Sequence, residues 1–177
     1  MKSTRLKQFD YSGQSQAYFL TLRFVHSMSG EVVKALYETL LRLFDKSGFA
    51  YDVLVVMPDH VHLVTHKETE SAERLSDLVC LLKSKSLYLL KKEGHVQRTF
   101  WQRGYYEHVI RNEKDWLEKV QYMIYNPVEA GLAPSAEAYP YLFVNVMLDG
   151  ATQGRPLREG KDMNTPRGGK DASLSSR

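Results

Sequence analysis

Two histidines separated by a single residue are the first reactive groups that stand out in this chain. His60 and His62 lie in the segment MPDHVHLV at 57–64. On a β-strand they point to the same face, about 6–7 Å apart and within reach of one metal ion. Imidazole binds Mn, Fe and Zn, and additional oxygen ligands favour Mn or Mg. Val61 and Leu63 point the other way and can pack under helices. A purely structural histidine pair is the alternative.

The segment YMIYNP at 122–127 contains a second reactive group. Tyr122 lies in a helix predicted over 112–125. At about 100° per residue, the apolar stripe of this helix points away from Tyr122. Its phenol is therefore expected on the polar side, with Asn126 one turn further on. Tyr125 is a rival on the other flank, and spacing alone does not separate the two. An ordinary exposed tyrosine is the alternative.

A metal ion beside a phenol suggests cleavage of a phosphodiester. The metal acts as a Lewis acid and orients the phosphate, and a phenol becomes a useful nucleophile once it loses its proton. A phosphotyrosine bond conserves the cleaved linkage, so that a 3′-OH can later reverse the step. This pair of groups therefore suggests DNA strand transfer.

The segment at 100–111 mixes aromatic and cationic residues, which suits stacking on single-stranded bases and pairing with phosphates. The alternative is a structural strand with a tryptophan packed at its entrance, and His108 within it is expected to be structural. The predicted DNA contacts are Lys83, Lys85, Arg98, Trp101, Arg103, Arg155 and Arg158.

Composition indicates one folded domain. The 177 residues are 43% hydrophobic and 25% charged, as in soluble globular proteins. The apolar run at 53–57 is too short to cross a bilayer and no signal peptide is evident, so we expect a cytoplasmic protein without a membrane partner. A single cysteine, Cys80, allows no internal disulfide. We expect a folded domain over 1–148 and a basic tail over 149–177, which is disordered when free and contacts phosphates.

Residue patterns predict an α+β fold. The order of elements, β-α-β-β-α-β-α, is that of a ferredoxin-like split βαβ fold, with helices packed on an antiparallel sheet. The final helix is expected to be capped by Asn112 and to end or kink at Asn126-Pro127. The predicted strands are 17–25, 51–57, 60–66 and 104–110, and the predicted helices are 30–46, 73–93 and 112–125, followed by a short apolar segment at 141–148.

Three motifs in order make a family resemblance specific. They are MPDHVH at 57–62, WQRGYYEH at 101–108 and YMIYNPVEAGLA at 122–133. Together they resemble the single-tyrosine HUH transposases, and most of all the REP-associated tyrosine transposases, over about residues 15–145. The resemblance implies that His60 and His62 bind a metal and that Tyr122, rather than Tyr125, is the nucleophile. It also implies a ligand role for Asn126, where relatives often have Gln.

The same resemblance implies a substrate and a reaction. We expect a Mg²⁺- or Mn²⁺-dependent endonuclease and strand transferase that acts on single-stranded DNA at hairpins formed by palindromic repeats. Its intermediate would be a 5′-phosphotyrosine, and a monomer is favoured over a homodimer. The alternatives are a hairpin-binding regulatory protein with little catalytic activity and a metal hydrolase that uses water.

Overall fold

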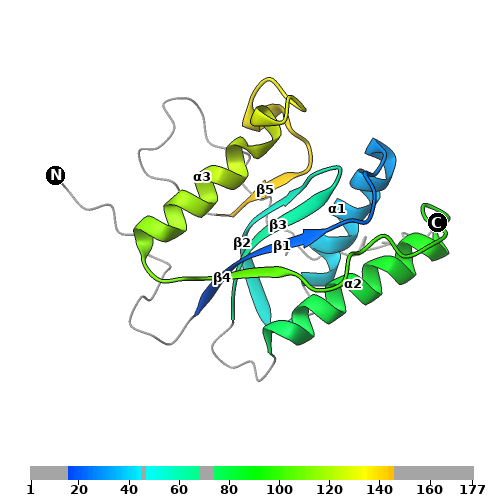
Figure 1. The fold of residues 1–177 in the computed structure, drawn as a ribbon, viewed down its shortest axis with the longest axis horizontal. Coiled ribbons are helices and arrows are strands. Elements are labelled where there is room, and N and C mark those ends of the chain that lie inside the picture. Colours follow the sequence, from blue (N-terminus) through cyan, green and yellow to red (C-terminus); the bar gives the residue numbers. More distant parts are fainter. Residues whose placement is uncertain (1–15, 45–46, 68–73, 146–177) are drawn as a thin grey trace, which may run out of the picture.

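The computed structural model describes residues 16–44, 47–67 and 74–145 (Figure 1). The predicted tail over 149–177, with Arg155 and Arg158, lies outside these residues. The elements are, in order, β1 (Ala17–Arg23), α1 (Gly30–Phe44), β2 (Phe49–Val56), β3 (His60–Lys67), α2 (Leu75–Lys92), β4 (Tyr106–Ile110), α3 (Glu113–Glu129), a short 3₁₀ helix (Ala136–Ala138) and β5 (Leu142–Val144).

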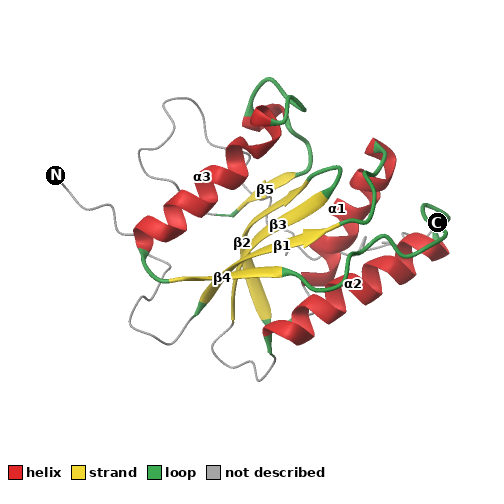
Figure 2. Ribbon diagram, viewed as in Figure 1, coloured by secondary structure: helices red, strands yellow, loops and turns green. Residues whose placement is uncertain are grey.

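The strands form one antiparallel sheet in the order β4-β1-β3-β2-β5 (Figure 2). The first four strands have the ferredoxin-like arrangement, in which β1 and β3 occupy the centre. This confirms the predicted α+β class. The apolar segment after α3 contributes β5, which extends the sheet beside β2.

Helices cover both faces of the sheet (Figure 1). Leu20, Leu22 and Leu63 point to the face covered by α1 and α2, where they join the larger core. Phe19 and Val64 point to the opposite face, where α3 packs over a second core. The division follows from strand geometry, because neighbouring side chains on a strand point to opposite faces. The second core decides the surroundings of the two histidines.

The third helix is longer than predicted. Asn112 caps it, because its side-chain oxygen accepts from the Asp115 amide, as the sequence indicated. The helix then continues through Pro127 to Glu129. A proline this close to the end removes one amide donor, and the last turn is closed by three other amides, including the bond from Leu132 N to Pro127 O. An end of the helix at Asn126-Pro127 was therefore wrong by about one turn, and a kink there stays a prediction.

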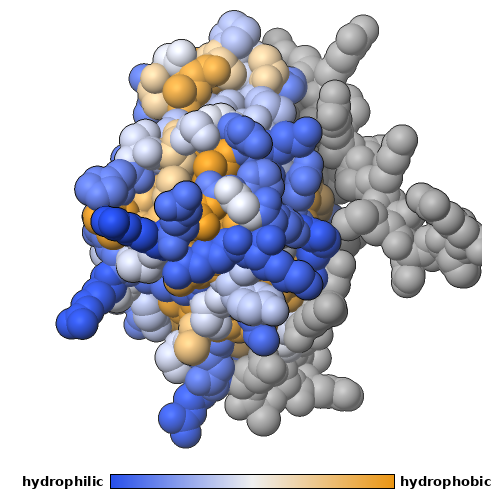
Figure 3. All heavy atoms as spheres, turned by 90° about the vertical axis from the view of Figure 1, so that its right-hand side faces the viewer, coloured by the Kyte–Doolittle hydropathy of each residue, from blue (hydrophilic) through white to orange (hydrophobic). Residues whose placement is uncertain are grey.

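The composition of the helices and of the surface that they present agrees with this architecture. Within the described ranges, no helix combines the length and apolarity that a membrane span requires. Figure 3 shows the side of the molecule that lies at the right of Figure 1, and hydrophilic side chains predominate on it. This is expected where helices have turned their apolar faces toward the sheet.

Candidate active site

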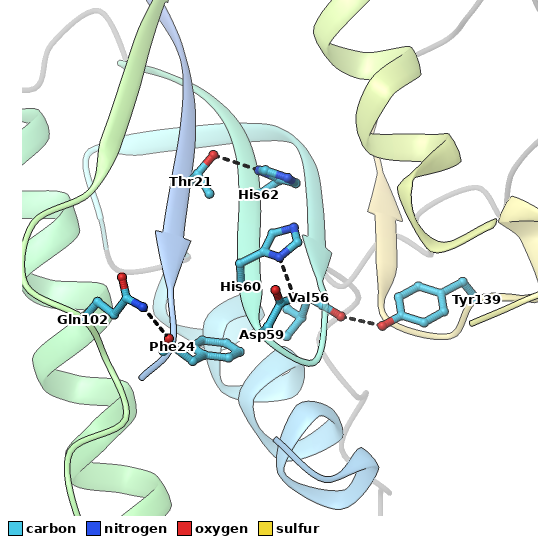
Figure 4. Close-up of polar contacts among 8 residues, drawn as sticks. All are labelled: Thr21, Phe24, Val56, Asp59, His60, His62, Gln102 and Tyr139. Carbon is cyan, nitrogen blue, oxygen red and sulfur yellow. Dashed lines mark hydrogen bonds and ion pairs between the residues drawn. The ribbon is translucent and has the colours of Figure 1, made fainter. Parts of the chain in front are cut away.

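His60 and His62 are the first and third residues of β3, next to the turn that joins β2 to β3. Their side chains project toward the face of the sheet that α3 covers. His60 and His62 stand opposite Arg23 and Thr21 of β1 in the antiparallel register. Their ring centroids are 4.4 Å apart, and Figure 4 shows both rings on the same strand. The sequence correctly placed them away from the core under α1 and α2. They do not lie on an open face, however, since the second core leaves His62 only 4% exposed.

Both imidazoles are held through their Nδ1 atoms (Figure 4). His60 Nδ1 lies 2.7 Å from the Asp59 carboxylate, and His62 Nδ1 lies 3.0 Å from the Thr21 hydroxyl. An ionised carboxylate only accepts, so His60 donates from Nδ1, and the neutral tautomer that makes this bond has its lone pair on Nε2. In the described structure, both Nε2 atoms are buried without a hydrogen-bond partner. Two orphaned imidazole nitrogens on one face fit a metal ion, which would satisfy both.

Burial keeps His62 neutral. Desolvation first, and then the neighbouring His60, lower the pKa of His62 from 6.5 to about 3. A neutral imidazole is the form that binds a metal, so His62 is ready for ligation across the physiological pH range.

This pKa shift predicts an acid-sensitive fold in the metal-free protein. The unfolded state binds the extra proton as the pH drops below 6.5, whereas the folded state resists it down to about 3, so stability falls with falling pH. Between pH 7 and pH 5, His62 should lower the free energy of unfolding by about 2 kcal/mol. Urea titrations in EDTA at both pH values measure this, with His62→Gln as the comparison. Equal pH dependence in the two proteins would contradict the assignment.

Tyr122 enters the same region from α3. Val120, Met123 and Ile124 are buried beneath the helix, and this orientation leaves Tyr122 at its edge, 47% exposed. The centroid of the Tyr122 ring is 5.2 Å from that of His62. Tyr125 is exposed to a similar degree, 50%, but does not line the cavity at the histidines. The helix therefore brings one of the two tyrosines to the imidazoles.

A cavity of about 480 Å³ joins these groups. Side chains from β1, β3, β4 and α3 line it, and no carboxylate is among the described lining residues. Asn126 is half-buried and is not part of the lining, although it lies one turn beyond Tyr122. The lining consists of Phe19, Thr21, Arg23, His60, His62, Tyr106, Lys119 and Tyr122.

Five of these lining residues were missed in the sequence. They are Phe19, Thr21, Arg23, Tyr106 and Lys119, although Tyr106 lay in the segment at 100–111 that was predicted as a whole to stack on bases. Two signals were available: Phe19, Thr21 and Arg23 alternate along one strand, and Lys119 precedes the tyrosine by three residues, which places both on one helix side. Neither signal indicates that β1 pairs beside the histidine strand.

The sequence of this chain matches a known protein family. A family profile described as "Transposase IS200 like" matches residues 19–125, which include the histidines and Tyr122.

The chain belongs to the IS200-like transposase family.

Individual relatives agree with the family match and confirm the resemblance noted in the motifs. The chain is 29% identical over 97 residues to a Haemophilus influenzae protein named as a candidate REP-associated tyrosine transposase, covering 50% of this chain and 54% of that protein. It is 28% identical over 96 residues to the REP-associated tyrosine transposase of Escherichia coli K12, covering 52% and 53%. The chain thus spans about half the length of these curated relatives.

A solved structure supports the fold. The REP-associated tyrosine transposase bound to a REP hairpin superposes with a TM-score of 0.62 at 21% identity, over 80% of this chain and 82% of the other. At this level of identity the likeness concerns the fold, and it agrees with the α+β architecture of an IS200-like transposase.

Two of the predicted DNA contacts in this IS200-like transposase are engaged elsewhere. Trp101 is 7% exposed in the larger core, and its indole N–H donates to Ser86 Oγ. This favours the structural alternative over base stacking. The Lys83 ammonium donates to the backbone carbonyls of Gln102 and Gly104. Burial lowers the pKa of Lys83. The Lys83 side chain holds the loop at 102–104 in place, and we call this segment the anchored loop.

The anchored loop is attached to the end of β1 beside the cavity. Gln102 N donates to Arg23 O, and the Gln102 side chain donates to Phe24 O (Figure 4). Lys85, Arg98 and Arg103 are exposed, so they remain available as DNA contacts. His108 binds Asp115 at 2.9 Å, in agreement with its expected structural role.

Proposed function

We propose that this chain cleaves and rejoins single-stranded DNA through a covalent bond to Tyr122. One observation supports this proposal most strongly: two buried, unpartnered imidazole nitrogens and one half-exposed phenol share a cavity with two cations and no carboxylate among its described lining. Membership in a transposase family makes DNA the natural substrate.

The reaction is a displacement at phosphorus. Tyr122 Oη attacks the phosphodiester, the Oη–P bond forms and the P–O3′ bond breaks. The phenol proton passes to a solvent base, and the leaving 3′ oxygen takes up a proton. The products are a 5′-phosphotyrosine and a free 3′-OH. Because a phosphodiester bond is retained, attack by another 3′-OH reverses the step and joins strands without a nucleotide cofactor.

A divalent metal, Mg²⁺ or Mn²⁺, fits the two histidines. His60 and His62 would hold it through Nε2, and the third ligand proposed is the side-chain oxygen of Asn126, one helical turn beyond Tyr122. When bound, the metal supplies Lewis-acid activation and orientation of the phosphate. The described residues contain no group of three His, Cys, Asp or Glu side chains suited to a metal, so substrate phosphate oxygens are expected to complete the site.

The substrate proposed is single-stranded DNA beside a hairpin. A structural relative with the same fold is described as bound to a REP hairpin, and two relatives are named as REP-associated transposases or candidates for that role. We expect a monomer. Phosphate contacts by Arg155 and Arg158 in the tail remain predictions, because these residues lie outside the described ranges.

A covalent adduct is the decisive test. Purified protein is incubated with Mn²⁺ and labelled oligonucleotides that contain the palindromes flanking its own gene. The products are then separated on a denaturing gel. A labelled band at the mass of protein plus DNA is expected, with the label on the 5′-phosphate side. Binding without a band would favour a regulatory hairpin-binding protein, and cleavage without a band would favour a water-dependent hydrolase.

A further inference from the structure

Two cations reach the cavity from different elements. Arg23 comes from the end of β1, opposite His60 in the register, and Lys119 comes from α3, one turn before Tyr122. None of the ion pairs formed among the described residues involves either side chain. Burial acts to raise the pKa of Asp115, but its hydrogen bonds to His108 and to the Arg111 amide lower it. Lys119 is close enough to Asp115 to help lower this pKa. Neither cation is ion-paired within the described ranges, so both can meet an anion that enters the cavity.

The positions of both cations are supported by their neighbours. The backbone carbonyl of Arg23 accepts from Gln102 N, which attaches this strand end to the anchored loop. The Lys119 ammonium lies 5.6 Å from the centroid of the Phe19 ring, close enough for a cation–π interaction. Phe19 itself is 4% exposed and forms the floor of the cavity. The fold thus places one cation on the strand residue opposite His60 and the other beside Phe19.

An exposed aromatic ring completes the cavity. Tyr106 of β4 is 57% exposed, and its ring meets the Phe19 ring edge-on, with centroids 6.4 Å apart and an interplanar angle of 70°. Phe19 makes a similar edge-on contact with Tyr122 at 6.2 Å. A large, exposed aromatic next to an anion site suits a nucleotide, because any base has a face that stacks on a tyrosine ring.

We propose that Arg23 and Lys119 bind the scissile phosphate from two sides and that Tyr106 stacks the adjoining base. The cavity would then take one nucleotide unit of the single strand. Attack on a phosphodiester adds negative charge to its non-bridging oxygens, and two cations that line the same cavity can stabilise that charge. This inference rests on the proposed function, because it assigns the binding groups of the same site.

Binding measurements test the phosphate contacts without any chemistry. A labelled hairpin oligonucleotide with a single-stranded flank is titrated in EDTA at several salt concentrations. Arg23→Gln and Lys119→Met should each reduce the slope of log affinity against log salt by about 0.7, the value for one phosphate contact to a single strand. Arg23→Lys and Lys119→Arg keep the charge and should keep the wild-type slope.

Lys114→Met is the matched control for the helix. Lys114 lies on α3, is 87% exposed and pairs with Glu118, so its loss should leave the slope unchanged. If Arg23→Gln and Lys119→Met give the slope of Lys114→Met, the phosphate assignment is overturned. Circular dichroism of each variant confirms that the fold is intact, and where one charge-removing variant does not fold, the slope of the other tests the assignment.

Tyr106 is tested by affinity at constant salt. Tyr106→Leu should weaken binding by at least about fivefold through lost stacking without changing the salt slope, and Tyr106→Phe should bind like the wild type. Tyr88→Leu is the control, because Tyr88 on α2 is exposed to a similar degree, 61% against 57%. Equal affinity of the Tyr106→Leu and Tyr88→Leu proteins would overturn the stacking role.

Neutral linkages locate the contact in the DNA. A series of oligonucleotides, each with one methylphosphonate in the single-stranded flank, is bound to the wild type and to the Arg23→Gln/Lys119→Met double variant. One linkage should weaken the wild type and leave the double variant unaffected, and the absence of such a linkage would overturn the proposal. Because this assay needs no cleavage, it is independent of the adduct test. If an adduct forms but no linkage behaves in this way, only the phosphate contacts are refuted. If one linkage behaves in this way but no adduct forms, only the proposed chemistry is refuted.

Discussion

Replacing Tyr122 with phenylalanine is expected to abolish both DNA cleavage and the covalent adduct. The substitution removes one oxygen, the proposed nucleophile, and keeps the ring that packs edge-on against Phe19 and His62. Cleavage should fall by at least about a thousandfold, as for other nucleophile removals, while hairpin affinity stays within about twofold, because only a hydroxyl is lost. Single-turnover cleavage and fluorescence anisotropy measure the two effects on one substrate.

Tyr125→Phe is the control for this prediction. Tyr125 lies on the same helix and is exposed to a similar degree, 50% against 47%, but it is absent from the described cavity lining. It should cleave like the wild type. If Tyr125→Phe were inactive and Tyr122→Phe active, the nucleophile would be misassigned, and α3 would have to rotate to present the other phenol.

Loss of either histidine is expected to eliminate metal-dependent cleavage. His60→Ala and His62→Ala each remove one of the two unpartnered Nε2 atoms that point to the same site. Mn²⁺ affinity should fall by at least about 100-fold, since even supporting residues around a metal alter affinity by 10–100-fold. Calorimetry in the presence of a DNA analogue that is not cleaved measures this directly. His60→Ala is the cleaner variant, because His62 is also packed in the second core.

His66→Gln tests whether the position on the strand matters. His66 lies on the same face of β3, four residues beyond His62, and pairs with the Asp52 carboxylate. Because it is not part of the cavity lining, this variant should retain Mn²⁺ affinity and cleavage. Unchanged Mn²⁺ affinity in the His60 and His62 variants would refute the ligand assignment.

Local chemistry allowed much of the fold to be predicted. Apolar periodicity identified the three long helices, and residue composition with turn residues identified four of the five strands, because each pattern reflects the backbone geometry of a single element. Asn112 was recognised as a cap for the same reason: its partner is the amide of Asp115, three residues away. The end of α3 was misplaced, since the effect of Pro127 depends on how the amides that follow find acceptors.

The surroundings of the site depended on contacts between residues far apart in the chain. Trp101 suited either DNA stacking or a core, and its burial in the larger core and its bond to Ser86 of α2 favour the core. Lys83 likewise suited a phosphate until the carbonyls of the loop at 102–104 were placed beside it. Side-chain type limits what a residue can bind, but its partners are set by packing.

By itself, the sequence determined that His60 and His62 share one face of a strand and that Tyr122 points away from the apolar stripe of its helix. Both facts follow from the repeat of the backbone within one element. Only the tertiary structure decided that these groups meet, because α3 had to cover the histidine face of the sheet rather than the face under α1 and α2. It also decided that Thr21 and Arg23 lie beside the imidazoles, because the antiparallel register of β1 and β3 pairs residues about forty positions apart. That register is fixed by burial of both strands on both faces.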